Sequence, residues 1–475
     1  MAGLFGELQR TAQALNAQSQ GIYTAGRNMA NVNNPAYARQ RVQLGDRGVV
    51  QTALGPQSLG VEALSLQNVR DALLDRQVIR ETAYAGNFEA EAEAYQKMEL
   101  ALGQQIDRQN DAQFIEGATT TGSTNGIGEA LDDLVNAFNS LSANPRSDAE
   151  RQVLLQKAQT FVARMQSVSS RLGDVQQDLN DSINTDVGDV NDLLDTISRL
   201  NEQIGRFEVG NPGSALDLRD QRQAKLEELS QLIDIEVQDV GTSGQIQILS
   251  RDATNTPVIL LDKSNEPPGV VFDGTNIIAG NPATVLEVRA GSIAGHLTAR
   301  DGTLASLRTD LDAFAAQVVT SFNETYNPGG ASTNFFVAAG TTAAAIALES
   351  TVTASSIRST NTADPGANEV ALAISDLASR EFSTGSGDLI EGSFSFFYRG
   401  IVARVANATA SAEGRYEDQA TLQRLVSERR DAVSGVSLDE EMTDLIKYQR
   451  AFDASAKVMR VMDEMLDVVV NGLVR

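Results

Sequence analysis

The two ends of the chain carry an apolar pattern that predicts a pair of helices. Apolar residues recur every seven positions near the N-terminus and at steps close to three and four near the C-terminus. Such spacing is typical of an amphipathic helix with a narrow apolar stripe. Because one helix cannot bury its own stripe, we expect the two ends to meet as a coiled coil. The stripes consist of Leu8, Leu15, Ile22 and Met29, and of Leu438, Met442, Leu445, Phe452, Met459 and Leu466.

The longest regular pattern lies in the first half of the chain. Ser147 and Glu150 have the spacing of a helix capping box, and apolar residues then keep steps of three and four from Leu154 to Phe207. About sixty residues at roughly 1.5 Å each predict a helix of about 90 Å. Two successive steps of four at 179–187 form a stutter. Further helices are expected at 68–102, 129–141, 216–232, 301–326 and 393–433, with a Gly- and Thr-rich loop at 117–128.

A change of period marks a β insert between the helical segments. From Ile235 the apolar residues alternate with polar ones, and turn signals stand at 241–244 and 273–274. We therefore predict a mainly α fold with a small inserted β domain, terminal coiled-coil helices and an elongated helical-bundle rod. The expected domains are nested and discontinuous: 1–36 plus 436–475 for the terminal helices, 37–234 plus 293–435 for the rod, and 235–292 for the β insert.

Composition excludes several classes of function. The chain has 475 residues and a net charge of −25, which disfavours nucleic acid and anionic membrane surfaces as partners. No stretch is apolar enough to predict a membrane span, and no cleavable signal peptide is evident. The chain has no cysteine, which excludes disulfides and thiolate metal sites.

No arrangement of residues predicts catalysis. His296 is the only histidine, and no nucleophile elbow or phosphate-binding loop is present. Paired carboxylates of a glycosidase stay possible by composition, but aromatic residues make up only 5% of the chain, which argues against a sugar-stacking cleft. The acidic segment 181–192 lacks the Gly and the final Glu of a calcium loop. We therefore predict no enzyme, no cofactor and no catalytic or metal site.

A dense polar segment after the first helix carries a resemblance to a known family. The segment 28–42, with Asn28, Asn31, Pro35 and Tyr37, resembles the N-terminal signature of bacterial flagellar axial proteins. Its ending, Arg39 and Gln40 after the tyrosine, is similar to that of the hook-associated protein 1 family, the first junction proteins between hook and filament. Asn34 and Ala36 depart from the usual Thr and Gly. The blocks 216–230, 434–441 and 448–458 resemble the same family.

The resemblance implies a structural subunit of the junction zone between hook and filament. The terminal stripes would form the subunit interface, and the segment around Asn28 would be the axial-protein motif. The implied partners are further copies of the chain, the hook protein, the second junction protein and an export chaperone on the C-terminal helix. The implied route is type III export, which would make the protein a secreted, extracellular part of the bacterial flagellum. The alternatives are a hook protein or a coiled-coil adaptor that does not polymerise.

Overall fold

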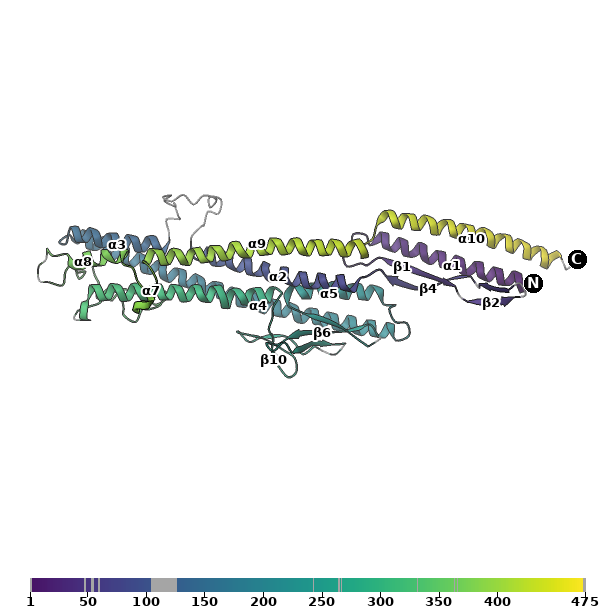
Figure 1. Cartoon of the computed structure of the whole chain (residues 1–475), viewed down its shortest axis with the longest axis horizontal. Helices are drawn as coiled ribbons and strands as arrows, with labels where there is room; N and C mark the ends of the chain where they lie inside the picture. Colours follow the sequence, from purple (N-terminus) through teal and green to yellow (C-terminus); the bar gives the residue numbers. More distant parts are fainter. Residues whose placement is uncertain are drawn as a thin grey trace. The chain divides into compact units, whose positions relative to one another are not determined.

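The computed structural model shows a mainly α fold with a few small antiparallel sheets (Figure 1). It describes residues 2–472 except 47, 53–54, 59, 104–125, 242, 264, 266, 331, 363 and 365. Most of the loop predicted at 117–128 lies outside the described residues. The helices are α1 (Ala2–Ala30), α2 (Ala72–Ala101), α3 (Ile127–Ala143), α4 (Asp148–Glu208), α5 (Leu216–Leu232), α6 (Ser292–Thr298), α7 (Ala305–Tyr326), α8 (Glu369–Asp376), α9 (Phe394–Ser434) and α10 (Leu438–Gly472).

The strands are short and lie in two segments of the chain, 40–68 and 236–285. Their bounds are β1 (Gln40–Asp46), β2 (Val49–Thr52), β3 (Gly55–Ser58), β4 (Val61–Asn68), β5 (Glu236–Val240), β6 (Gln245–Arg251), β7 (Pro257–Asp262), β8 (Val271–Phe272), β9 (Ile277–Ala279) and β10 (Thr284–Val285). The predicted turn at 241–244 connects β5 to β6, and that at 273–274 connects β8 to β9, so both are confirmed. A π-helical turn, Ala299–Leu304, lies between α6 and α7.

Contacts within the chain group it into two units. One contains Met1–Ala85, Val187–Gly291 and Gln419–Arg475, and the other contains Gly86–Asp186 and Ser292–Asp418. The boundary crosses α4 next to the predicted stutter. These bounds differ from those of the three nested domains inferred from the sequence, and that finer division stays a prediction.

Helix α4 confirms the longest sequence pattern. The Ser147 hydroxyl accepts a hydrogen bond from the Glu150 backbone N–H at 3.2 Å, as a capping residue does. The apolar residues of the pattern are buried from Leu154 to Ile204. The last residue of the pattern, Phe207, is 68% exposed, so the buried stripe ends before it. Glu208 is buried in its place, since the Arg219 guanidinium pairs with its carboxylate at 2.7 Å.

The second unit, Gly86–Asp186 with Ser292–Asp418, has a dense aromatic core. Its rings meet mostly edge to face, at centroid distances such as 5.3 Å for Phe138 and Phe335. The core combines α3, α7 and the early parts of α4 and α9. Its fully buried phenylalanines are Phe138, Phe161, Phe314, Phe322, Phe335, Phe336 and Phe394. This unit therefore buries an aromatic core of its own.

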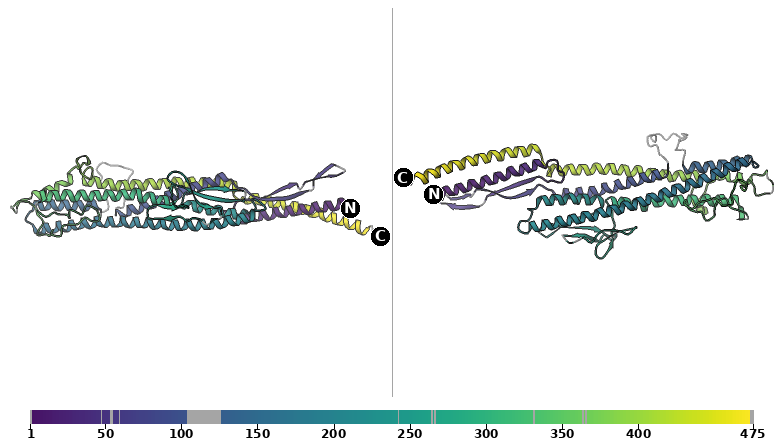
Figure 2. Two further views of the ribbon diagram at one scale, coloured as in Figure 1. Left: turned by 90° about the horizontal axis from the view of Figure 1, so that it is seen from below. Right: turned by 180° about the vertical axis from the view of Figure 1, so that it is seen from behind.

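The first unit contains both ends of the chain. Helices α1 and α10 lie side by side and run in opposite directions, which two further views confirm (Figure 2). Strands β1 and β4 form an antiparallel ladder that also packs on α1, with Gln40 opposite Asn68. Strands β5, β6 and β7 form a separate sheet in that order. The prediction that the helices at the two ends of the chain pack on each other is thereby confirmed.

Candidate assembly interface

Helices α1 and α10 approach each other closely at a glycine. A Cβ atom added to Gly21 would lie only 2.7 Å from the Cδ1 atom of Tyr448, so the tyrosine ring rests on the bare backbone. Ten residues earlier on α1, the Thr11 hydroxyl lies 3.8 Å from the Met462 sulfur. These two contacts fix the register of the antiparallel pair.

The buried face of α1 consists of small or polar residues. It contains Thr11, Ala17, Gly21, Thr24, Ala25 and Asn28. The predicted stripe of Leu8, Leu15, Ile22 and Met29 is only half-buried. Small residues allow helix backbones to come close, as at other tightly packed helix pairs. The heptad pattern thus predicted the helix and its partner correctly. It predicted large apolar side chains at the contact with α10, where the structure has small or polar ones.

Helix α10 leaves most of its apolar surface uncovered in the isolated chain. Among its side chains described between 438 and 469, only Glu441 is fully buried. Leu438 and Met442 are 48% and 52% exposed. The other predicted interface residues are half-buried, namely Leu445, Phe452, Met459 and Leu466. The contact with α1 therefore covers the predicted stripe incompletely.

A second apolar row lies on α10, and the sequence analysis missed it. Val458, Val461, Met465 and Val468 follow one another at steps of three and four and are 46–72% exposed. The 3/4 spacing was visible in the sequence, but a single stripe was assumed for this helix. Contiguous exposed apolar surface of this kind is typical of a site of protein association.

Asn28, in the last turn of α1, is the centre of the motif at 28–42. Its side-chain amide nitrogen donates to the Gln40 carbonyl and to Glu441 Oε2, each at 2.9 Å. Its amide oxygen accepts from the Gln40 backbone N–H at 3.0 Å and from the Tyr37 hydroxyl at 2.8 Å. The buried amide thus uses its two donors and both acceptor positions. This explains a specific need for Asn at position 28.

Arg39 connects the motif to the start of α10. This side chain is buried, and its Nε donates to Glu441 Oε1 at 2.6 Å while Nη1 donates to Glu440. Asp444 lies farther away, at 3.8 Å from Nη2. Burial lowers the pKa of Arg39, but the carboxylates of Glu441 and Glu440 outweigh it, so the net pKa is raised. Sequence reasoning had flagged Arg39 but not its partner.

The remaining contacts of the motif hold the turn against the end of α1 and against α5. Asn31 donates its side-chain N–H to the Arg27 carbonyl at 2.9 Å near the end of α1, and Pro35 lies in the turn that follows. Gln40 Nε2 donates to Asp217 Oδ1 at 2.9 Å. Asp220 accepts the Ala38 backbone N–H at 3.1 Å, and burial raises its pKa. The segment 28–42 and the block 216–230 are therefore parts of one contact.

Comparison with known proteins identifies the family. The model of the flagellar hook-associated protein FlgK helical domain matches residues 112–336. The model of the flagellar basal body rod FlgEFG protein C-terminal region matches residues 431–472. The chain is 28% identical to flagellar hook-associated protein 1 of Bacillus subtilis (strain 168), over 100% of this chain and 99% of that protein. These matches support membership of the hook-associated protein 1 family.

Other relatives agree with the hook-associated protein 1 family. Flagellar hook-associated protein 1 of Escherichia coli (strain K12) is 24% identical, over 98% of this chain and 99% of that protein. The fold resembles that of the flagellar hook junction protein FlgK from Burkholderia pseudomallei, with a TM-score of 0.59 and 13% identity. That match covers 75% of this chain and 100% of the other. This chain is a structural junction protein of the bacterial flagellum, and the matches do not favour the hook-protein or adaptor alternatives.

Within the described residues, no cluster of three or more His, Asp or Glu side chains is arranged to hold a metal ion. His296 is buried, and burial, followed by the charge of Lys97, lowers its pKa. No helix in the described part of the chain is both long and apolar enough to cross a bilayer.

Proposed function

We propose that this chain assembles into the junction zone by packing its terminal helices against neighbouring subunits. This packing would bury the apolar surface of the helices that is exposed in the free chain. The observation that carries the proposal is the incomplete burial of α10, whose apolar rows are half-covered or exposed along its length. Burying apolar surface contributes about 25 cal/mol per Å² removed from water. The uncovered rows would therefore stabilise an assembled state over the free chain. This role is structural and includes no catalytic step.

The hydrogen-bonded cluster of Asn28, Arg39 and Glu441, called the polar joint below, gives the terminal helices a defined direction. Arg39 and Asn28 both bond to Glu441, so the last turn of α1, the start of β1 and the first turn of α10 meet at one carboxylate. A buried ion pair with satisfied hydrogen bonds favours one geometry. The predicted terminal domain of 1–36 plus 436–475 would thus present its apolar rows at a fixed angle to the next subunit.

The assembly would be an open or ring-forming stack of head-to-tail contacts. Its neighbours would be further copies of the chain, the hook protein on one side and the second junction protein on the other. The subunit would reach this position unfolded, through type III export. The absence of cysteine suits such a route, because no disulfide would have to form outside the cell.

An export chaperone is proposed as the first partner of α10. The rows on this helix are rich in methionine, whose flexible side chain adapts to different surfaces. A chaperone would cover them before export, and neighbouring terminal helices would replace it after assembly. Both contacts would use Phe452, the aromatic residue of the half-buried stripe.

The test uses the full chain with Phe452→Asp. Wild-type protein should extend purified hook polymers with a cap visible by electron microscopy, and the variant should not. The melting temperature of the aromatic core around Phe322 should stay the same in both. Phe396→Asp is the matched control, since Phe396 is 66% exposed and lies on α9. Normal incorporation of the Phe452 variant would refute the proposed interface.

A further inference from the structure

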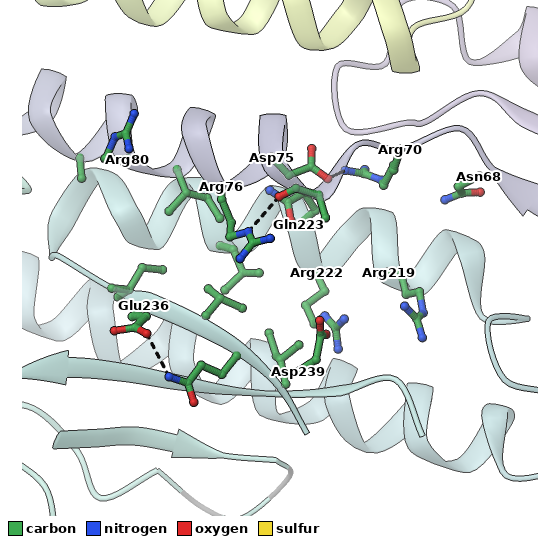
Figure 3. A pocket seen from close by; sticks show the side chains of 18 of the residues that line it. Asn68, Arg70, Asp75, Arg76, Arg80, Arg219, Arg222, Gln223, Glu236 and Asp239 are labelled. Carbon is green, nitrogen blue, oxygen red and sulfur yellow. Dashed lines mark hydrogen bonds and ion pairs between the residues drawn. The ribbon is translucent and has the colours of Figure 1, made fainter. Parts of the chain in front are cut away.

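A cavity of about 930 Å³ lies within the first unit and away from the terminal helices. It opens between the first turns of α2 and α5 and the strand β5 (Figure 3). Arg76 projects into it from α2 and Arg222 from α5, while Asp239 stands on the strand. Apolar residues such as Ile79 and Leu226 also line it. Its size and mixed lining are those of a ligand site.

Arg222 is buried in this cavity without a carboxylate partner. It is only 6% exposed. Its Nη1 donates to Asn201 Oδ1 at 2.7 Å and to the Gly244 carbonyl at 2.8 Å. Among the described residues, no acceptor bonds its Nε or Nη2, and no carboxylate contacts the side chain. Burial, followed by the charge of Arg219, lowers its pKa to about 10.

The free edge of the guanidinium defines the chemistry that would fit. Nε and Nη2 of an arginine form the parallel fork that binds a carboxylate through two hydrogen bonds. Two neighbouring arginines are already paired, Arg219 with Glu208 and Arg70 with Asp75 and Asp220. Arg76 bonds the Ala72 carbonyl and is exposed to water, whereas Arg222 is buried. Arg222 is therefore the group in this cavity that a new carboxylate would satisfy.

Strand β5 supplies a second feature that points to a ligand. It is an edge strand, since the sheet order is β5-β6-β7, and in the described part of the chain no strand pairs with its other side. Residues 236–239 of this strand line the cavity. An unpaired edge exposes backbone N–H and C=O groups that can take up another strand.

Nearby carboxylates restrict the ligand further. The negative charge of Asp239 offsets part of the lowering of the Arg222 pKa, although the two side chains do not form an ion pair. Asp234 also lines the cavity. These carboxylates would repel the many negative charges of a polyanion. A peptide with a single carboxylate between apolar side chains would be repelled less. This excludes nucleic acid as the favoured ligand and favours an extended peptide.

We propose that this cavity binds an extended segment of another polypeptide, which pairs with the free edge of β5 and places one carboxylate on Nε and Nη2 of Arg222. The site lies apart from the α1–α10 interface, and it is tested on the unassembled chain. Failure of one proposal therefore leaves the other standing.

The test is peptide binding to the full chain, measured by calorimetry. The probe is a blocked heptapeptide of alternating Thr and Val with one central Asp. Charge-assisted hydrogen bonds predict that an Asn analogue of the probe binds at least about tenfold more weakly. Arg222→Gln and Arg222→Lys should each weaken the Asp probe by about tenfold or more, since neither keeps the fork. Arg206→Gln is the control and should bind normally, because Arg206 is exposed and pairs with Glu202.

Three results would overturn the inference. They are the absence of binding by the wild-type chain at about 1 mM probe, equal binding of the Asp and Asn probes, and equal binding by Arg222→Lys. An N-methylated probe tests strand pairing separately, because it cannot donate backbone hydrogen bonds. Undiminished affinity of this probe would refute pairing with β5. If circular dichroism shows that Arg222→Gln does not fold, Arg222→Lys decides, since it keeps the charge.

Discussion

Helices α7 and α10 show two ways in which an apolar pattern is used. On α7, Phe314 and Phe322 are fully buried in the aromatic core of their own unit. On α10, no apolar side chain described between 438 and 469 is fully buried. Periodicity is similar evidence for a helix in both cases. The difference shows that a pattern predicts which face is apolar, but not whether the same chain covers it.

The largest effect should come from charging the exposed row of α10. The double variant Val461→Asp and Met465→Asp should lose assembly almost completely, because two interface side chains at about 2 kcal/mol each change an association constant by roughly a thousandfold. Sedimentation of assembled material measures this. Melting should not change, since both side chains are already about half exposed in the free chain.

Val271→Asp is the matched control for that double variant. Val271 is 58% exposed on β8, outside the terminal helices. It should assemble like the wild type. Equal loss of assembly in the control would show that added negative charge, and not the α10 row, is responsible.

A smaller but still large effect should follow from breaking the buried pair at the joint. Glu441→Ala removes the buried carboxylate that accepts from Arg39 Nε and from the Asn28 amide, and breaking a buried ion pair typically costs about 3–5 kcal/mol. Urea unfolding of the first unit should show this loss. Glu228→Ala removes an exposed pair with Lys225 and should cost about 1 kcal/mol or less. Similar losses in the two variants would contradict a structural role for the joint.

The sequence predicted elements well where the period was local. The bounds of α5 were predicted as observed, and the predicted core positions of α4 are buried as far as Ile204. Phe207 continues the apolar period but is exposed, because the period of a helix does not specify how far its neighbours cover it. The pair of Arg39 with Glu441 joins residues 402 positions apart, which no local pattern specifies. Gly21 was missed for another reason: a glycine in a seam carries no apolar signal.

Two glycines of α1 sharpen the comparison between covered and uncovered helix faces. Gly21→Ala adds a methyl group against Tyr448 and should cost about 1–3 kcal/mol in the stability of the helix pair. Gly26→Ala adds the same group where nothing lies within 4 Å, and should stabilise the helix by about 1 kcal/mol. Thermal melting of the two variants measures the contrast. A Gly21 variant as stable as the Gly26 variant would show that the seam is not close-packed.

The smallest effect is a shifted titration at the joint. Burial raises the pKa of Tyr37 to about 12 from an ordinary 10.0. Because the folded value is the higher one, the stability from its neutral hydroxyl is complete below pH 10 and is lost as pH rises through 12. The absorbance difference between wild type and Tyr37→Phe should show this midpoint. A midpoint near 10 would mean that the Tyr37 hydroxyl is not buried in the folded chain.

The most direct measurement is a cryo-EM map of the hook–filament junction at side-chain resolution. It would show whether the α10 row left open in the free chain is covered after assembly. The account predicts that Val458, Val461, Met465 and Val468 lie against terminal helices of neighbouring subunits, with Arg39 still bonded to Glu441. A map in which this row faces water, while subunits meet through other surfaces, would contradict it.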